Sequence, residues 1–500
     1  MTEAIAISLS LISHTNAGKT ALARTLVGRD VGEVRDAPHV TQVAAPYPLI
    51  TTTDGDSLIL WDTPGFGDSA RLARRLAQQG NPIGWFLSQV WDRFRDRTLW
   101  LSQQAVRNVR DEADVVLYLV NAAEAPEDSG FLVPELAVLD WIGKPVIVLL
   151  NQTGRPRPRD EEAQDEARWR AALGARSLIR SVITLDAFAR CWVQEISLLR
   201  TIGEALSEDK RAGFARLAGA WQARRLQQFD DAMNAITLPI AMTAWDSEAV
   251  PDQGMRGALQ TLGKTIGFAR NDEAAARNPS SEALAKRLDS ALRESTDRLI
   301  SIHELGGHAT ADVLARLTRS VDIDAPMNEG AAAAMAGVVS GALTGLAADV
   351  AAGGLTFGAG MLTGALLGAL GGASIARGMN LARGTAGTLL RWDDAFLSRL
   401  VTEAILRYLA VAHYGRGRGD WVETEYPAFW KPLVSRLVEQ RSASFTAAWS
   451  QRQPECNVDS LVATLRPLIF DTTRDVLIAL YPDARAAFTP TTTHTALQAS

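Results

Sequence analysis

The sequence predicts an α/β fold, namely a doubly wound, mostly parallel sheet with one antiparallel edge strand, followed by a mainly α-helical region with a Gly/Ala-rich helical hairpin. Three observations lead to this fold. A turn that ends in Gly-Lys-Thr joins an apolar run to a helical pattern, and a second apolar run ends in Asp-Thr-Pro-Gly. Further apolar runs then alternate with helical patterns, which is typical of a parallel sheet.

Length and composition set broad limits on the kind of protein. The chain has 500 residues, more than one core usually supports, so two or three domains are expected. A formal net charge of −6 gives no electrostatic reason to predict a nucleic-acid partner. Cys191 and Cys456 have no pair spacing, which fits a reducing compartment. The N-terminus lacks a basic region, so no signal peptide is expected.

The turn at residues 13–20 has the length and position of a phosphate-binding loop. It lies between the apolar run 5–12 and the helical pattern 21–27, so its N–H groups can face a phosphate. Lys19 can reach the β- and γ-phosphates, and the Thr20 hydroxyl can bind Mg²⁺. Ser13 replaces the usual first glycine, which is tolerable at negative φ. The predicted nucleotide-binding residues here are Ser13, His14, Thr15, Asn16, Ala17, Gly18, Lys19, Thr20 and Ala21.

Residues 62–65 (Asp-Thr-Pro-Gly) supply the second motif, which makes a chance Gly-Lys-Thr at a strand end a poor alternative. Asp62 would bind Mg²⁺ through water, and the Gly65 amide would contact the γ-phosphate. Thr41 lies in a loop where it would bind both Mg²⁺ and the γ-phosphate, although an ordinary loop hydroxyl is the alternative. The predicted catalytic groups are therefore Lys19, Thr41 and Gly65, and the predicted Mg²⁺ ligands are Thr20, Thr41 and Asp62.

The remaining strand patterns complete a domain over residues 1–208. A hairpin is expected from residues 47–53 and 57–61 around a tight Asp-Gly turn, and it supplies the antiparallel edge. Further strands are expected in the apolar runs at 115–121, 146–150 and 178–185. The aromatic stretch between 67 and 112 fits either a pair of amphipathic helices packed on the sheet or a lengthened switch that signals to a partner.

With these motifs in place, residues 1–208 resemble the Era/TrmE branch of bacterial P-loop GTPases. Asn16 in the phosphate loop and the Asp-Thr-Pro-Gly of residues 62–65 carry the resemblance. It implies GTP and GDP as ligands, hydrolysis of GTP to GDP and phosphate, Mg²⁺ as cofactor, and K⁺ bound at Asn16 as an activator. Phe66 stands where Ras-like enzymes have a water-orienting glutamine, so we expect slow intrinsic hydrolysis.

Two further stretches bear on the resemblance. Asn151 and Gln152 match the beginning of the base-recognition motif and are predicted to bind the nucleotide, whereas Gly154 replaces its aspartate. The choice between guanine and adenine therefore stays open. The C-terminal part, including residues 412–419, resembles an uncharacterised domain attached to such GTPases, and this resemblance implies no activity.

The region beyond residue 208 is divided by its composition. We expect helical regions at 209–326 and 379–489, a hairpin at 327–378, and a disordered tail at 490–500. Within the hairpin, glycines recur every four residues, at 337, 341 and 345 and again at 360, 364 and 368, which lets two helices approach closely. Residues 331–348 would span roughly 27 Å as a helix, against a hydrocarbon core of about 30 Å.

Flanking charge predicts how this hairpin would sit in a bilayer. Arginines precede and follow it but are absent from its turn, which by the positive-inside rule puts both ends on the cytoplasmic face of the inner membrane. The alternative is a tightly packed hairpin in a cytoplasmic protein, because Ala and Gly contribute little insertion energy.

The function predicted from these features is a GTP-hydrolysing molecular switch associated with a membrane. Its partners would be GTP or GDP, a lipid bilayer through residues 330–377, and a membrane protein or a second copy of the chain, with no nucleic acid. Two alternatives remain from other classes: a nucleotide-binding scaffold with little hydrolysis, and a dynamin-like enzyme that remodels bilayers.

Overall fold

The computed structural model forms two compact units. The first comprises Met1–Gln227, His413–Trp421 and Leu477–Ser500, and the second comprises Gln228–Ala412 and Val422–Val476. The five segments predicted from the sequence stay predictions beside this division. The structure describes residues 4–14, 17–28, 45–66, 68–77, 97–153, 158–185, 187, 191–249, 279–305, 379–384, 387–414, 427–452 and 457–489.

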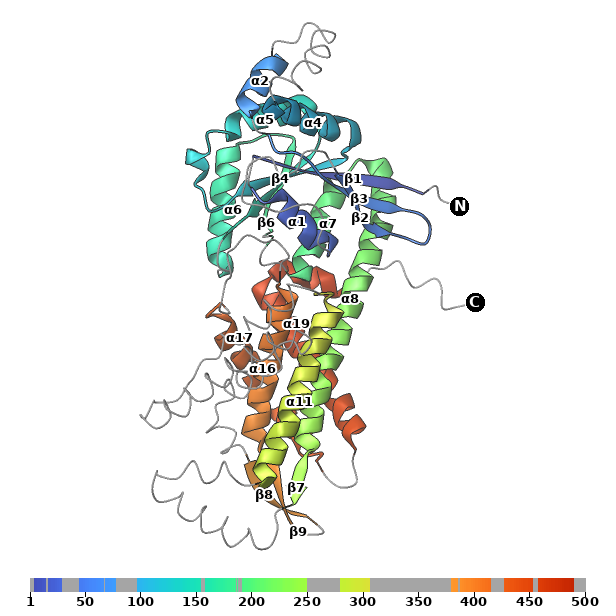
Figure 1. Ribbon diagram of the computed structural model, residues 1–500, viewed down its shortest axis with the longest axis vertical. Coiled ribbons are helices and arrows are strands. Elements are labelled where there is room, and N and C mark those ends of the chain that lie inside the picture. The colour runs from blue at the N-terminus through green and yellow to red at the C-terminus, as the bar shows by residue number, and fades with distance from the viewer. Residues whose placement is uncertain are drawn as a thin grey trace, which may run out of the picture. The chain divides into compact units, whose positions relative to one another are not determined.

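A six-stranded sheet forms the centre of the first unit (Figure 1). Its strands run in the order β2-β3-β1-β4-β5-β6, and β2 is antiparallel to β3 while every other neighbouring pair is parallel. This arrangement confirms the predicted doubly wound sheet with one antiparallel edge. The strands are β1 (Ala6–Ser13), β2 (Ala45–Thr51), β3 (Ser57–Asp62), β4 (Val115–Asn121), β5 (Val146–Asn151) and β6 (Ile179–Thr184).

Helices cover both faces of the sheet, which explains why the central strands β4 and β5 are almost entirely apolar. One face packs against α1 (Lys19–Val27), α7 (Trp192–Ala205) and the first part of α8 (Glu208–Trp245). The other packs against α2 (Ser69–Ala77), α4 (Arg97–Glu112), α5 (Leu132–Ile142) and α6 (Arg159–Leu173). The described part of this unit also includes the 3-10 helices η1 (Pro126–Asp128) and η2 (Pro482–Phe488).

The first part of α8 is bonded to the sheet unit through charged pairs. The Lys210 amine lies 2.5 Å from an Asp114 carboxylate oxygen, and the Arg216 guanidinium donates two hydrogen bonds, of 2.7 and 2.9 Å, to Asp56. Trp221 and Arg225 both donate to the buried Glu195 of α7. α8 is therefore part of the α/β unit over its first turns rather than a linker that follows it.

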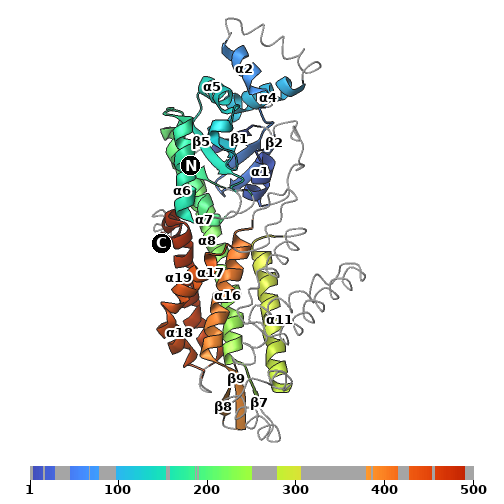
Figure 2. The same ribbon diagram turned by 90° about the vertical axis from the view of Figure 1, so that its left-hand side faces the viewer.

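Helices dominate the second unit (Figure 2). They comprise the remainder of α8, α11 (Pro279–Ile302), α16 (Asp394–Ala412), α17 (Trp430–Glu439), α18 (Ser442–Trp449) and most of α19 (Val458–Leu480). α16 is mostly apolar and buried along nearly its whole length. The ring of Phe229 on α8 contacts those of Tyr408 on α16 and Phe470 on α19, so aromatic packing joins three helices.

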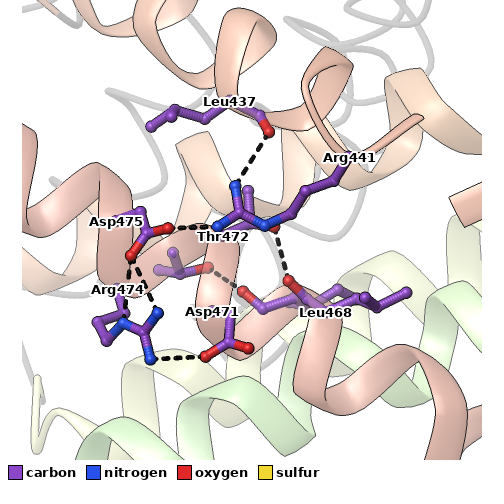
Figure 3. Close-up of polar contacts among 9 residues, drawn as sticks. Leu437, Arg441, Leu468, Asp471, Thr472, Arg474 and Asp475 are labelled. Carbon is purple, nitrogen blue, oxygen red and sulfur yellow. Dashed lines mark hydrogen bonds and ion pairs between the residues drawn. The ribbon is translucent and has the colours of Figure 1, made fainter. Parts of the chain in front are cut away.

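A polar network holds α19 to the segment between α17 and α18 (Figure 3). The Arg441 guanidinium bonds Asp475 and also reaches the Leu437 carbonyl, at 3.4 Å. Arg474 lies 2.7 Å from Asp471 and 3.1 Å from Asp475. The side chains of this network are all partly exposed, so we interpret it as a structural contact and not as a ligand site.

A small antiparallel sheet in the second unit was not predicted from the sequence. β8 (Met379–Gly384) pairs with β9 (Gly387–Trp392), which pairs on its other side with β7 (Ser247–Ala249). The sheet lies at one end of the helices in both views (Figures 1 and 2). Its strands are short, and β7 is distant in sequence from β9, so no local pattern identifies the pairing.

Among the described residues, the structure contains no helix with the length and apolar composition that a transmembrane segment requires. The predicted hairpin at 327–378 and the tail at 490–500 lie outside the described residues, as does most of the aromatic stretch near Phe86. The predictions made for these segments are therefore untested.

Candidate nucleotide-binding site

The phosphate loop begins where β1 ends and finishes at the first turn of α1. Gly18 caps this helix with a φ of +87°, a conformation that favours glycine. A β-carbon at Gly18 would also lie only 2.5 Å from the side-chain nitrogen of Asn151. Two constraints therefore favour glycine at position 18, namely its backbone angle and the close approach of the Asn151 side chain.

Lys19 is buried beneath this loop, with 8 % of its surface exposed. Its amine donates a 2.9 Å hydrogen bond to the hydroxyl of Ser13, the residue that replaces the usual glycine. Burial lowers the pKa of Lys19, and the negative charges of Asp62 and Glu135 act in the opposite direction. A buried amine held by a neutral hydroxyl is well suited to exchange that partner for a phosphate oxygen.

Thr20 and Asp62 come together at the end of β3 as the two motifs predict. The Thr20 hydroxyl donates to an Asp62 carboxylate oxygen at 2.6 Å. A hydroxyl beside a carboxylate offers the hard oxygen donors that Mg²⁺ prefers, and phosphate oxygens and water normally complete its coordination. The donor set therefore fits Mg²⁺, although no group of three or more His, Cys, Asp or Glu side chains suited to a metal occurs among the described residues.

The segment after Asp62 is fixed to β1. The Phe66 amide donates to the Ser13 carbonyl at 3.1 Å, and Phe66 pairs with His14 in a parallel bridge. The Phe66 side chain is fully buried in the core beneath α2, α4 and α5. Gly65 is thus placed next to the phosphate loop, and the Phe66 ring is part of the hydrophobic core.

Asn151 links the phosphate loop to the segment after β6. Its side-chain nitrogen donates to the Ala17 carbonyl at 2.7 Å, and its oxygen accepts from the Ala187 amide at 2.8 Å. Thr25 of α1 donates to the Ala187 carbonyl at 2.9 Å. Gln152 has a φ of +56°, and its side-chain nitrogen would lie 3.4 Å from a β-carbon at Gly18. Both predicted base-side residues therefore adjoin the phosphate loop.

Sequence reasoning missed three residues of this site. Ala187 is one, and the others are Glu135 of α5 and Tyr118 of β4. A Glu135 oxygen lies 2.9 Å from Nδ1 of His14, and its second oxygen accepts from the Tyr118 hydroxyl at 2.7 Å. The available signal was the position of Glu135 on the apolar stripe of its helix, where a carboxylate is unusual.

Several predicted residues lie outside the described part of the chain. Thr15, Asn16, Thr41 and Gly154 all belong to segments whose placement the structure does not describe. The K⁺ ligand, the switch threonine and the question of base selectivity therefore stay predictions. Ser13, His14, Ala17 to Ala21, Asp62, Gly65, Asn151 and Gln152 are all described.

Comparison with known proteins adds a family to this geometry. The model of a domain of unknown function, DUF3482, matches residues 170–462, which is more than half of the chain. The chain belongs to the DUF3482 family. The description of this family assigns no activity to it.

A second family model, described as 50S ribosome-binding GTPase, matches residues 8–152 of this DUF3482 protein. That range contains the phosphate loop, the Asp-Thr-Pro-Gly motif and Asn151. The DUF3482 protein therefore carries a GTP-binding domain of the P-loop GTPase fold. The predicted resemblance to P-loop GTPases is confirmed, whereas the Era/TrmE branch within them stays a prediction.

Solved structures similar to the DUF3482 protein include Era from Aquifex aeolicus bound to GDP·AlF4⁻, and Era in complex with MgGDPNP and a segment of 16S ribosomal RNA. Each is 19 % identical, with a TM-score of 0.30, and the alignment covers 41 % of this chain and 58 % of the other. An SsGBP variant is 18 % identical with a TM-score of 0.22, covering 42 % and 56 %. The DUF3482 chain thus spans less than two thirds of these proteins. No curated protein matches it significantly.

Proposed function

We propose that this protein hydrolyses GTP to GDP and phosphate and uses the nucleotide state as a switch. The observation that supports the proposal most directly is the 2.6 Å hydrogen bond between Thr20 and Asp62, with the buried Lys19 next in sequence to Thr20. Three side chains from two separate motifs thereby meet at one end of the sheet, where P-loop proteins bind phosphates.

The reaction would be in-line attack of water on the γ-phosphate. Lys19 and the N–H groups of the loop would stabilise the charge on the phosphate oxygens, and Asn151 would hold the loop against the base-binding segment. Thr20 and Asp62 would bind Mg²⁺, which when present neutralises charge on the β- and γ-phosphates. Thr41 would contact the γ-phosphate, and Asn16 would bind an activating K⁺.

Nucleotide hydrolysis is tested by measuring phosphate release from GTP and ATP by the full chain, in potassium and in sodium buffer. We expect turnover that is selective for GTP and faster in potassium. No turnover of either nucleotide, with binding retained, would contradict hydrolysis and favour the scaffold alternative. Turnover of ATP as fast as GTP would contradict guanine selectivity alone.

Lys19→Ala tests the assignment of the phosphate loop. The loss of a charge-assisted contact to phosphate should weaken nucleotide binding by about 100-fold, measured with a fluorescent GDP analogue. Lys210→Ala is a matched control, because Lys210 belongs to the same unit but bonds Asp114. Equal effects of the two substitutions would contradict the assignment.

We further propose that the switch acts at the cytoplasmic face of the inner membrane. The support is the sequence of residues 327–378, with its glycine spacing and flanking arginines. Flotation of the full chain with phospholipid vesicles, compared with a chain lacking residues 327–378, tests this proposal. Equal flotation of both would contradict it, and nucleotide-dependent assembly on the vesicles would favour the dynamin-like alternative.

A further inference from the structure

His14, the second residue of the phosphate loop, is held from two sides. Its ring stacks on that of Phe131 at a centroid distance of 4.2 Å, with 10° between the planes. Its Nδ1 lies 2.9 Å from the Glu135 carboxylate, which also accepts the Tyr118 hydroxyl. When Glu135 is ionised, its carboxylate can only accept, so the contact then requires a proton on Nδ1 of His14 and leaves Nε2 as an acceptor in the neutral ring.

The orientation of the ring leaves its other nitrogen accessible. Nδ1 faces Glu135, which is fully buried, whereas 35 % of the His14 side chain is exposed. Nε2 of His14 is not among the described buried side-chain atoms that lack a hydrogen-bond partner, and it is directed away from Glu135. A planar base with one nitrogen anchored and the other free has the arrangement of the histidines that assist hydrolysis in many enzymes.

Glu135 is a buried carboxyl group in a largely apolar stretch of α5. The neighbouring buried positions of α5 include Leu132, Leu136 and Leu139, and an apolar side chain at 135 would extend the same core. Burial instead raises the pKa of Glu135, which is the cost of placing a carboxyl group there. Buried carboxyl groups with shifted pKa values are concentrated at functional sites, and this one contacts the phosphate loop directly.

Because Phe66 replaces the glutamine of Ras-like enzymes, hydrolysis would need another residue to orient the attacking water. The residue after Gly65 cannot orient water here, because its side chain is apolar and fully buried in the core. His14 is the residue that pairs with Phe66 in the bridge between the two nucleotide motifs. The backbone of His14 therefore lies beside the residue that stands where Ras-like enzymes have their water-orienting glutamine.

We propose that His14 is a further catalytic residue of GTP hydrolysis, hydrogen-bonding the attacking water through Nε2, and that Glu135 and Tyr118 are its positioning residues. The proposal rests on the hydrolysis proposed above. A bond forms between the water oxygen and the γ-phosphorus, and the bond from that phosphorus to the β–γ bridging oxygen breaks. Both water protons leave with inorganic phosphate, so His14 orients the water and ends the cycle unchanged.

The decisive variants distinguish the contribution of the His14 nitrogens from that of ring stacking. His14→Phe keeps an aromatic ring to stack on Phe131 but has no nitrogen. We expect the kcat for GTP to fall about 100-fold while the Kd for GDP changes less than about threefold. His14→Gln, which supplies an amide acceptor, should recover part of the lost rate.

Glu135→Gln tests the positioning role. It removes the charge that fixes Nδ1–H, and kcat should fall about tenfold with little change in KM. Glu195→Gln is the matched control, because Glu195 is equally inaccessible, at 2 % exposed, but bonds Trp221 and Arg225 instead of the phosphate loop. That variant should keep its kcat within about twofold of the wild type.

The outcomes distinguish the two proposals. A wild type that hydrolyses GTP together with an equally active His14→Phe would overturn the role of His14 and leave the proposed function intact. A wild type without turnover would overturn both. Loss of GDP binding in His14→Phe, with the thermal unfolding temperature unchanged, would assign His14 to binding and overturn the catalytic role.

Discussion

Asp56 and Glu135 are both fully buried carboxylates of the GTP-binding domain, yet their surroundings are opposite. Asp56, in the turn between β2 and β3, accepts two hydrogen bonds from the Arg216 guanidinium and one from the Ile5 amide. Hydrogen bonding to Arg216 lowers the pKa of Asp56. Glu135, beside the phosphate loop, contacts a phenol and an imidazole, and burial raises the pKa of its carboxyl group.

The difference separates a structural region from a ligand-binding region. Where α8 packs against the sheet unit, two buried acids have a cationic partner on this helix. Asp56 is bonded by Arg216, and Glu195 is bonded by Arg225. At the phosphate loop, the buried Lys19 donates to a neutral serine. Charges that the protein compensates itself stabilise the fold, whereas charges held by neutral groups are available to a ligand.

The largest effect on stability is expected where a buried carboxylate is most completely neutralised by a cationic side chain. Arg225→Met leaves Glu195 buried with Trp221 as a remaining donor, and this should lower the free energy of unfolding by about 3 kcal/mol. Urea unfolding monitored by circular dichroism measures the loss. A change below about 0.5 kcal/mol would mean that the α8 contact does not compensate Glu195.

The pH dependence of stability should have opposite sign at the two carboxylates. The lowered pKa of Asp56 means that its ionised form stabilises the fold above its ordinary value of 3.8, and this contribution is lost as the pH falls through the lowered pKa. Wild type should therefore lose more stability than Asp56→Asn on acidification below about pH 4, as measured by urea midpoints.

Glu135 supplies the other half of that test. Because its folded pKa is raised above 4.5, its contribution is present below that value and is lost as the pH rises through the raised pKa. Relative to wild type, Glu135→Gln should become more stable as the pH increases over that range. The stability of each variant relative to wild type is plotted against pH. Slopes of the same sign for Asp56→Asn and Glu135→Gln would contradict the comparison.

The smallest effect is expected in the second unit. Arg441→Met breaks the contact with Asp475 in the network of Figure 3, where the side chains of Arg441 and Asp475 are 23 % and 32 % exposed. Partly solvated pairs contribute little, so the free energy of unfolding should change by less than about 1 kcal/mol. If Arg441→Met lowered the free energy of unfolding as much as Arg225→Met, solvent exposure would not distinguish the Arg441–Asp475 pair from the buried Arg225–Glu195 pair.

The sequence was sufficient for those parts of the site that are short and continuous. Lys19 and Thr20 follow a strand at fixed spacing, and Asp62 ends another strand, so parallel pairing of β1 with β3 brings them together. The fold class was predictable for the same reason, because strand and helix patterns alternate along the first two hundred residues.

The remaining features depend on contacts between distant segments. Glu135 reaches His14 across 121 residues, and nothing in the local pattern indicates that the first variable position of the loop has a partner on α5. Asn151 likewise joins Ala17 to Ala187, two residues far from it in sequence. The pairing of β7 with β9 also joins distant segments, and β7, with three residues, is too short to show a periodicity.

α8 has a consequence for the order in which the protein is made. Phe214, Leu217 and Trp221 of this helix belong to the same core as the phosphate-loop helix, and Gln222 donates to the Ala487 carbonyl at 2.8 Å. A nascent chain that has emerged only as far as residue 208 lacks these core side chains, and it lacks the contact with Ala487 until that residue has been synthesised. The nucleotide-binding domain is therefore expected to complete its folding only after residue 487 has been synthesised, and a fragment ending at 208 would expose an apolar face.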